Sequence, residues 1–430
     1  MYNGCSNLSE ITVGLLSWEH NDTRDWVAGV APTGTFICPG ELEKEHADNR
    51  IPVGWTVKYI EGDCNFLTFT AEEDSSSFCV EHFGQNNPNL RYSLDNGDTW
   101  IDLKGDKTIV LEHTGDKVLL KGKNISGLSQ EDNVYTQFKM TGAIAASGSV
   151  MSLIDGVGAS TMIPNRKCFF YLFNKCKALT QAPELPATEL TQECYSHMFE
   201  QCGNLKEAPK LPATSLETGC YENMFEQCGL TAAPELPATK LAERCYNNMF
   251  KNCKNLTEAP EVLPATSLEK ECYKSMFTSC TNLKKTPKLP ATELAEMCYM
   301  DMFSYCDNLT DVSALPATEL AGRCYNNMFH ACTNLTQAPE LPATSLADYC
   351  YMGMFSQCTN LTQAPELPAT SLADYCYMGM FSQCTNLAQA PKLPATSLAD
   401  YCYMDMFSDC ERLTDAPELP AETLAAECYR

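Results

Sequence analysis

The amino-acid sequence predicts an α/β solenoid, with short parallel strands on one side and short helices on the other, and with a small all-β domain inserted before it. The main observation is a repeat: residues 350–375 return almost letter for letter at residues 376–401. Diverged copies run from residue 168 to residue 430, and a fixed period of 26 residues is typical of stacked repeat architectures. The second observation is a change of composition over residues 61–150, where short apolar runs alternate with Asn, Asp and Gly turns.

The second half of the repeat LxxAPxLPATxLxxxCYxxMFxxCxN predicts a short helix with one buried face. Its apolar residues recur every four positions in two parallel rows, which are Leu372, Cys376, Met380 and Cys384, and beside them Tyr377 and Phe381. Thr370 or Ser371, followed by Asp374, would cap the start of this helix. Asn360 or Asn386, after the second cysteine, would take a left-handed conformation at its end.

The first half of the repeat, LTQAPELPA, is too short and too rich in proline for a helix. It predicts a short extended strand, bulged near the proline, with Leu361, Ala364 and Leu367 facing inward. One unit buries too little apolar surface to offset the entropy of ordering its chain, so neighbouring coils must share a core. Stacked strands would then form a parallel sheet with a spacing of about 4.8 Å.

These residues resemble a known family. The MFxxCxxL core, followed after a short strand and a helix by another MFxxC, resembles the BspA-like leucine-rich repeats of bacterial surface proteins over residues 164–430. The chain differs from the commonest form of that repeat by carrying APxLPAT where other members have a leucine-rich strand. The resemblance implies a leucine-rich repeat fold and an extracellular or cell-surface protein that adheres to host proteins or to other bacteria.

The first residues fit the same template. Residues 1–8 match MFxxCxNL, so we expect the chain to open inside a repeat and to be a piece of a longer protein. Residues 1–60 are then the end and C-terminal cap of an upstream array, with a strand over 10–16, a capped helix over 22–30 and an apolar run at 34–37. Residues 151–430 form the repeat array proper, which we expect to be truncated at its end.

Residues 61–150 predict a small antiparallel β domain resembling a sandwich. Its expected strands are residues 66–70, 78–83, 90–93, 99–103, 108–111 and 118–121. The clearest turn, from Ser93 to Trp100, matches the SxDxGxTW pattern of the Asp-box hairpin of sialidase propellers. One copy cannot make a propeller, so we interpret the box as a folding device. The Gly- and Ser-rich residues 142–158 are expected to lead into the array.

Composition limits the classes of partner and of chemistry. The chain has 55 acidic and 30 basic residues and a net charge of -25, which disfavours nucleic acid and anionic membranes as partners. No apolar run reaches transmembrane length, so we expect no direct membrane insertion of this segment. The six histidines are scattered and no HExxH, GxSxG or phosphate-loop motif is present. We therefore expect no enzyme, no catalytic residues and no cofactor.

The 25 cysteines raise the question of disulfides. The two cysteines of one unit would be roughly 12 Å apart on a helix, beyond the disulfide limit of about 7 Å. Equivalent cysteines of adjacent coils could form a bonded ladder, but we favour buried free thiols that act as small hydrophobic groups. We expect no metal site, because neither CxxC nor histidine accompanies them. Cys38, Cys64 and Cys79 lie outside the repeat, and any pair of them could be bridged.

Two surfaces vary between repeats and are candidates for ligand binding. The first is a mostly acidic ladder on the strand side, formed by the residue before each strand leucine: Glu184, Lys210, Glu235, Glu261, Lys288, Ala314, Glu340, Glu366, Lys392 and Glu418. It would favour basic or hydroxylated partners. We give more weight to the alternative that it is a solvated face whose charges prevent strand aggregation.

The second candidate is a stripe on the helix side. It consists of three tyrosines and, three residues after each, a methionine: Tyr349, Tyr375, Tyr401, Met352, Met378 and Met404. Earlier copies hold Glu, Arg, Gly, Asn or Lys there, so packing does not require an aromatic residue. An exposed stripe of this kind indicates a contact patch. A recent duplication that copied an accident, or a half-buried contact between neighbours, explains it equally well.

Three classes of function follow. The leading hypothesis is a non-enzymatic recognition or adhesion protein of the cell surface, which binds protein or glycan on host or neighbouring cells through the repeat surface. The alternative is a structural spacer in a larger extracellular assembly or in a bacteriophage tail. An enzyme such as a glycan hydrolase comes third.

Overall fold

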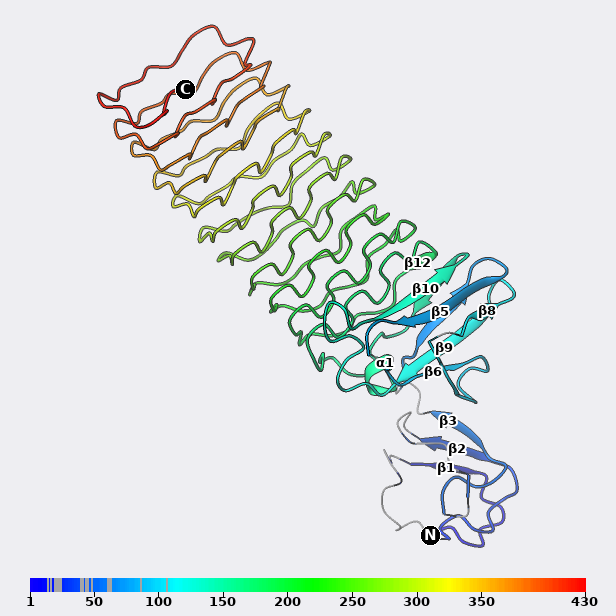
Figure 1. Cartoon of the computed structure of the whole chain (residues 1–430). Coiled ribbons are helices and arrows are strands. Elements are labelled where there is room, and N and C mark those ends of the chain that lie inside the picture. The colour runs from blue at the N-terminus through cyan, green and yellow to red at the C-terminus, as the bar shows by residue number, and fades with distance from the viewer. Residues whose placement is uncertain are drawn as a thin grey trace.

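The repeats form a long stack of coils that runs from a group of β-sheets near the N-terminal end to the C-terminus (Figure 1). This computed structural model describes residues 1–13, 15, 18, 25–38, 42, 46–47, 49–59, 64–85, 87–105 and 107–430. Within them, regular strands are confined to the first 181 residues, and the helix α1 spans only Ser152–Asp155. The coils beyond are built from turns and isolated bridges.

A parallel sheet begins the chain, with the order β1 (Glu10–Thr12), β2 (Thr35–Cys38) and β3 (Thr56–Tyr59). It encloses a small core of its own that includes Ile11, Phe36 and Trp55. β1 falls within the strand predicted over residues 10–16, and β2 overlaps the apolar run at 34–37 and ends one residue beyond it. The expected helix over 22–30 is wrong in its described part, because residues 25–29 form turns; residues 14, 16 and 22–24 lie outside the described residues.

The next strands form two sheets, with the orders β10-β5-β8 and β12-β11-β4-β9-β6-β7. Six strands lie where the sequence predicts them, namely β4 (Leu67–Ala71), β5 (Ser76–His82), β6 (Leu90–Ser93), β7 (Ile101–Asp102), β8 (Ile109–Leu111) and β9 (Lys117–Gly122). Sequence reasoning missed β10 (Thr136–Thr141) and β11 (Ile144–Ser147). The segment 142–158, expected only as a connection, therefore contains both β11 and α1.

The Asp-box turn between β6 and β7 is closed by its own side chains. The Gly97 N–H donates to Ser93 Oγ over 2.8 Å, and the Thr99 N–H donates to Asp95 Oδ1 over 2.8 Å. Hydrogen bonds from Ser93, and then from Thr99, lower the pKa of the Asp95 carboxyl. This carboxylate is used to close the hairpin, which confirms the interpretation of the box as a folding device.

The sheets and the coils share one core. β12 (Leu179–Gln181), in the first coil, pairs in parallel with β11. The Phe138 N–H donates to the carbonyl of Leu172 over 2.8 Å, and the two rings Phe138 and Phe173 stack at 5.4 Å. The stack of coils therefore continues directly from the edge of the larger sheet.

A ladder of turns occupies the part of each coil where the sequence predicts a helix, so that prediction is wrong. Alternate N–H groups donate to the next coil, as from Tyr351 to the Cys376 carbonyl over 2.9 Å. The N–H groups between them donate three residues back, as from Met352 to Tyr349 over 3.2 Å. A left-handed residue recurs every four positions, at Tyr349, Gly353 and Gln357 (φ 59°, 61° and 63°). An α-helix excludes both features, since its bonds run four residues back and its residues are right-handed.

The four-residue spacing that indicated a helix has a different origin here. Two successive turns form a unit of four residues, so side chains four apart return to the same side. The inward rows are consequently those that the sequence predicts, with Cys376, Tyr377, Met380, Phe381 and Cys384 all buried. Identical rings stack from coil to coil, with the centroids of Phe355 and Phe381 5.8 Å apart and their planes 8° apart.

The expected helix caps are also wrong, because there is no helix to cap. Ser371 forms an isolated parallel bridge with Ser397. Asn360 and Asn386 are not left-handed. Instead, Asn386 Nδ2 donates to the Thr359 carbonyl over 2.8 Å, so these asparagines link one coil to the next.

The opposite side of each coil holds isolated parallel bridges rather than continuous strands, as between Gln337 and Gln363. The two prolines of each APxLPAT segment have no N–H to donate, and they interrupt any longer ladder. The inward positions of this segment were predicted correctly, since Leu361 and Leu367 are buried and Ala364 packs partly against the core.

All 21 cysteines of the array, that is all except Cys5, Cys38, Cys64 and Cys79 of the 25, are buried and free. The second cysteine of a repeat donates its S–H to the preceding coil, as from Cys358 Sγ to the Phe329 carbonyl over 3.1 Å. The prediction of buried free thiols is confirmed for the array. Burial raises the pKa of several of these thiols to about 12, namely those of Cys176, Cys194, Cys245, Cys298 and Cys350.

The left-handed positions give a first test. Gln383 is exposed and has φ 62°. Gln383→Gly should leave the free energy of unfolding unchanged or raise it by up to about 1 kcal/mol, whereas Gln383→Val should lower it by about 1–2 kcal/mol. Urea unfolding followed by circular dichroism measures both. The exposed Gln389, whose φ is not positive, is the control and should show the opposite order; equal effects at the two sites would contradict the turn ladder.

The thiol row gives a second test. Unfolded thiols ionise near pH 8.5, whereas burial raises the pKa of the native Cys350 thiol to about 12, so the native state binds more protons between these values. Stability should therefore be full below about pH 8 and fall at higher pH by about 1.4 kcal/mol per pH unit for each thiol. Urea midpoints measured under reducing conditions from pH 7 to 11 test this. Replacing Cys350 and Cys376 by Ala should flatten the slope, and a constant midpoint up to pH 11 would contradict the burial.

Candidate binding surface

The strand-side ladder lies on the surface in every coil. Its ten residues, from Glu184 to Glu418, are all exposed. Some are paired along the stack, as Lys288 Nζ with Glu261 Oε1 at 3.0 Å. Glu340 and Glu366 border a shallow depression lined by proline residues of two coils. The structure thus places this ladder as sequence reasoning expects, spread along one side of the rod.

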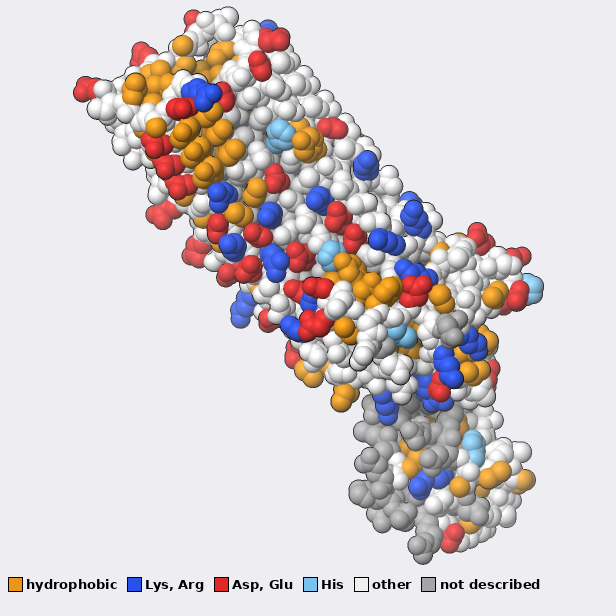
Figure 2. All heavy atoms as spheres, in the orientation of Figure 1, with side chains coloured by type: hydrophobic (Ala, Val, Ile, Leu, Met, Phe, Trp, Pro, Cys, Tyr) orange, Lys and Arg blue, Asp and Glu red, His pale blue; other side chains and the backbone are white. Residues whose placement is uncertain are grey.

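The stripe of Tyr349, Tyr375, Tyr401, Met352, Met378 and Met404, called the Tyr–Met stripe below, lies on the opposite, turn-bearing side. All six residues are half-buried rather than exposed, as in the alternative of a half-buried contact between neighbouring coils. The three tyrosine rings form a column, with centroids 4.5 and 4.6 Å apart and planes 5° and 4° apart. Figure 2 shows hydrophobic side chains gathered over the last coils, with acidic side chains along their edge.

The ring faces between neighbouring tyrosines and the outer face of Tyr349 are covered. Neighbouring rings cover one another, and the Arg323 guanidinium lies 4.6 Å from the Tyr349 centroid at one end of the column. A partner therefore meets ring edges and hydroxyl groups. The pKa of Tyr375 is raised by desolvation and then by the neighbouring tyrosines and by Asp374 and Asp400, so its hydroxyl stays neutral at physiological pH.

A row of aspartates borders the stripe, and sequence reasoning missed it. Asp348, Asp374 and Asp400 are exposed and each precedes one of the three tyrosines. Asp348 Oδ1 accepts the Asp374 N–H over 3.2 Å, and Asp374 Oδ1 accepts the Asp400 N–H over 3.0 Å. These bonds hold the carboxylates in a column. Each aspartate directly precedes a tyrosine of the stripe in three successive repeats, and this pattern in the sequence could have predicted the row.

Two further features of the stripe were missed. Met297 and Met300 occupy its two columns two coils before Tyr349, and both are half-buried. On the far side of the methionines, Gly379 takes the left-handed position that Asn327 fills in an earlier copy. No atom lies within 4 Å of the place a Gly379 Cβ would take. The stripe is therefore flanked by carboxylates on one side and by an open space at Gly379 on the other, whereas the Asn327 side chain occupies the corresponding place at Gly353.

An aromatic cluster joins the sheets to the first coils. Phe83 stacks on Tyr135 at 4.4 Å, Tyr135 contacts Tyr171 at 5.1 Å, and Tyr171 contacts His197 at 4.8 Å. His197 Nδ1 lies 2.7 Å from Glu200 Oε2. No periodicity connects Phe83 and Tyr135 to the repeats, so the sequence holds no signal for this cluster.

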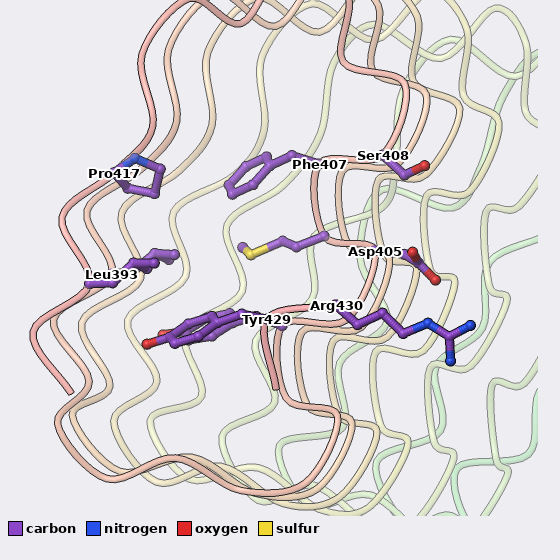
Figure 3. A pocket seen from close by; sticks show the side chains of 10 residues that line it. Leu393, Asp405, Phe407, Ser408, Pro417, Tyr429 and Arg430 are labelled. Atoms are coloured by element: carbon purple, nitrogen blue, oxygen red, sulfur yellow. The ribbon is translucent and has the colours of Figure 1, made fainter. Parts of the chain in front are cut away.

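A cavity of about 440 Å³ lies at the last coil (Figure 3). The side chains of Leu393, Phe407 and Tyr429 project into it, whereas those of Asp405 and Arg430 point away. Its walls are thus the inner rows of the stack, which explains its apolar lining by packing alone. Among the described residues, no three His, Cys, Asp or Glu side chains are arranged to hold a metal ion, and no helix could cross a membrane.

Comparisons with known proteins bear on the repeats. A family model described as BspA type leucine rich repeat region, with six copies, matches residues 166–284, 218–336 and 296–417. A crystal structure of a leucine-rich repeat protein from Bacteroides ovatus is similar at 16% sequence identity and a TM-score of 0.34, over 70% of this chain and 82% of that one. No curated protein matches the chain. The family match spans more than half of the sequence.

The half-buried position of the tyrosine column predicts that it contributes little to folding. Tyr375→Arg should change the free energy of unfolding by less than about 1 kcal/mol, because Arg323 already packs on a tyrosine of the same column. Phe381→Ala, in the buried row, should lower it by about 3–5 kcal/mol. Urea unfolding compares the two. A loss as large for Tyr375→Arg as for Phe381→Ala would make the stripe part of the core.

Proposed function

Because this chain belongs to the family of BspA-type leucine-rich repeat proteins, we propose that it is a non-enzymatic recognition protein that binds a protein or glycan partner through its repeat surface. The observation that carries this proposal is the half-exposed Tyr–Met stripe. Leucine-rich repeat proteins generally act as binding scaffolds, and the stacked coils offer a long face on which side chains can change without disturbing the core.

The composition of the stripe supports a contact role. Its columns hold Arg323 and Asn326 in an earlier coil of the same geometry, so the stack forms without tyrosine and methionine there. Tyrosine supplies a large apolar area with a polar end, and methionine adapts to the shape of a partner. Surface residues of this kind, grouped and bordered by charge, are typical of interfaces.

The strand-side ladder is the second candidate face. Its lysines and glutamates are exposed and partly paired with one another, as Lys288 with Glu261. Exposed pairs contribute little free energy and keep a surface solvated. We therefore assign recognition to the turn-bearing side and solubility to the strand side.

We further propose that the protein acts outside the cell, at the cell surface. An oxidising environment normally converts accessible thiols to disulfides. The array thiols are buried, and burial raises the pKa of Cys350 to about 12, so the reactive thiolate is scarce. Free cysteines in these repeats are thus compatible with display outside the cell.

A structural role is the second candidate function. Hydrogen bonds join each coil to the next, and the larger sheet shares its core with the coils. This favours a stiff solenoid that could act as a spacer in a larger extracellular assembly or in a bacteriophage tail. A spacer makes its contacts at its ends, and it needs no apolar patch on its flank.

Binding measurements on immobilised matrix proteins and mucin glycans separate these functions. The variant Tyr375→Arg/Met378→Asn copies the coil of Arg323 and Asn326, and it should keep the fold but weaken binding at least tenfold. The control Glu366→Ala copies Ala314 on the strand side and should bind like the natural chain. Equal binding by the stripe variant would remove this face from the proposal, and loss with Glu366→Ala would move the site to the strand side. If no matrix protein or glycan binds, the spacer function takes precedence.

A further inference from the structure

The Tyr–Met stripe, its row of aspartates and the open space at Gly379 together define the chemistry of a partner. We infer that this surface binds a cationic amphipathic helix of a partner protein, with basic side chains against the aspartates and apolar side chains against the tyrosines and methionines. This inference rests on the proposed function and names the class of ligand for the same face.

The covered ring faces of the tyrosine column favour protein over glycan. Sugars bind aromatic residues by stacking on an open ring face, but the ring centroids here are 4.5 and 4.6 Å apart, and Arg323 covers the end at Tyr349. Along the column between Arg323 and Tyr401, a partner meets a ridge of ring edges and hydroxyl groups beside flexible thioethers. Such a ridge suits aliphatic side chains, which need no particular ring face.

The aspartate row favours a basic partner. One oxygen of Asp348, Asp374 and Asp400 accepts a backbone N–H, which fixes three carboxylates in line with the tyrosines. The second oxygen of each is not used in these bonds. Arginine and lysine side chains can pack their aliphatic stems on the stripe while their charged ends reach the carboxylates. The net charge of -25 adds a long-range attraction for cations.

The spacing of the coils favours a helical partner over an extended one. Hydrogen-bonded coils repeat at about 4.8 Å, so three rungs span about 9.6 Å. A helix laid along the stack places one side chain on the same face in each turn of about 5.4 Å. Over two turns its side chains are displaced from the coils by only about 1 Å. In an extended strand, side chains on the same face are about 6.7 Å apart, so over two such steps they are displaced from the coils by about 4 Å. The helix therefore stays in register with all three aspartates.

The open space at Gly379, in the middle coil of the stripe, gives such a helix room. The three coils of the stripe hold Gly353, Gly379 and Asp405 at this left-handed position. The Asn327 side chain fills the place of a Gly353 Cβ, so the opening lies at Gly379. A side chain at position 379 would project into open space. Gly379→Asn is thus a variant whose backbone conformation the stack already accepts, and it fills the open space without touching the stripe.

The test uses synthetic peptides titrated into the full chain, with binding measured by fluorescence anisotropy. The probe is a helical peptide with arginines at positions i, i+4 and i+7 and leucines on the adjoining face. Its controls are a scrambled peptide of equal composition and a peptide with glutamate in place of arginine. We expect the basic helix to bind at least tenfold more tightly than either control, and to weaken as salt is raised from 50 to 500 mM.

Variants locate the site. Tyr375→Arg and Gly379→Asn should each weaken binding of the basic helix about tenfold or more, and Asp374→Asn, which keeps the Oδ1 acceptor, about three- to tenfold. Glu366→Ala on the strand side should have no effect. Unchanged binding by the three stripe variants, or equal binding of the scrambled or acidic peptide, would overturn the inference.

Two outcomes separate this inference from the function on which it rests. If matrix proteins bind and Tyr375→Arg/Met378→Asn weakens them, but the basic helix does not bind, the function stands and the helical ligand is wrong. If a mucin glycan binds at the stripe with the same sensitivity, the glycan replaces the helix as ligand. If nothing binds at the stripe, the helical ligand is wrong, and the recognition function stands only if a partner binds the strand side; if no partner binds either side, both proposals fail.

Discussion

Hydrogen bonding between successive coils is the constraint on which the rest of the structure depends. In the turn ladder, every second N–H must find a carbonyl one coil further on, as from Tyr351 to Cys376. This requirement fixes the rung spacing, brings identical rings into stacks and returns a left-handed residue every fourth position. Side chains inside the stack are then confined to columns of one type, while those outside are free to differ.

Much of this arrangement can be predicted from the sequence. The period, the inward rows and six of the strands before the array follow from the spacing of apolar residues alone. The positions that are buried recur with the sequence repeat, and this holds for any backbone conformation. The predicted conformation of the backbone, a helix in the second half of each repeat, is wrong. Four-residue spacing is shared by an α-helix and by paired turns, and only the left-handed residues, such as Tyr349 and Gln357, distinguish them. These are ordinary side chains rather than glycines, so their letters give no warning.

The candidate surface can be predicted from the sequence in part, for a related reason. Tyr375 and Met378 stand out because other copies differ at their positions, and comparison between repeats finds such residues. Asp374 repeats as faithfully but was read as a helix cap, and the incorrect helix hid its place in a column. Gly379 carries information only once its neighbours in space are known. The cluster of Tyr135 and His197 depends on a contact between distant segments, which no repeat comparison can supply.

The near identity of residues 350–375 and 376–401 has an evolutionary consequence. A coil that accepts the same partner above and below can be copied by recombination without a redesign of its contacts. Each such copy lengthens the stripe by one tyrosine, one methionine and one aspartate. Duplication or loss of a repeat would therefore lengthen or shorten this surface in discrete steps, without any change to the residues inside the stack.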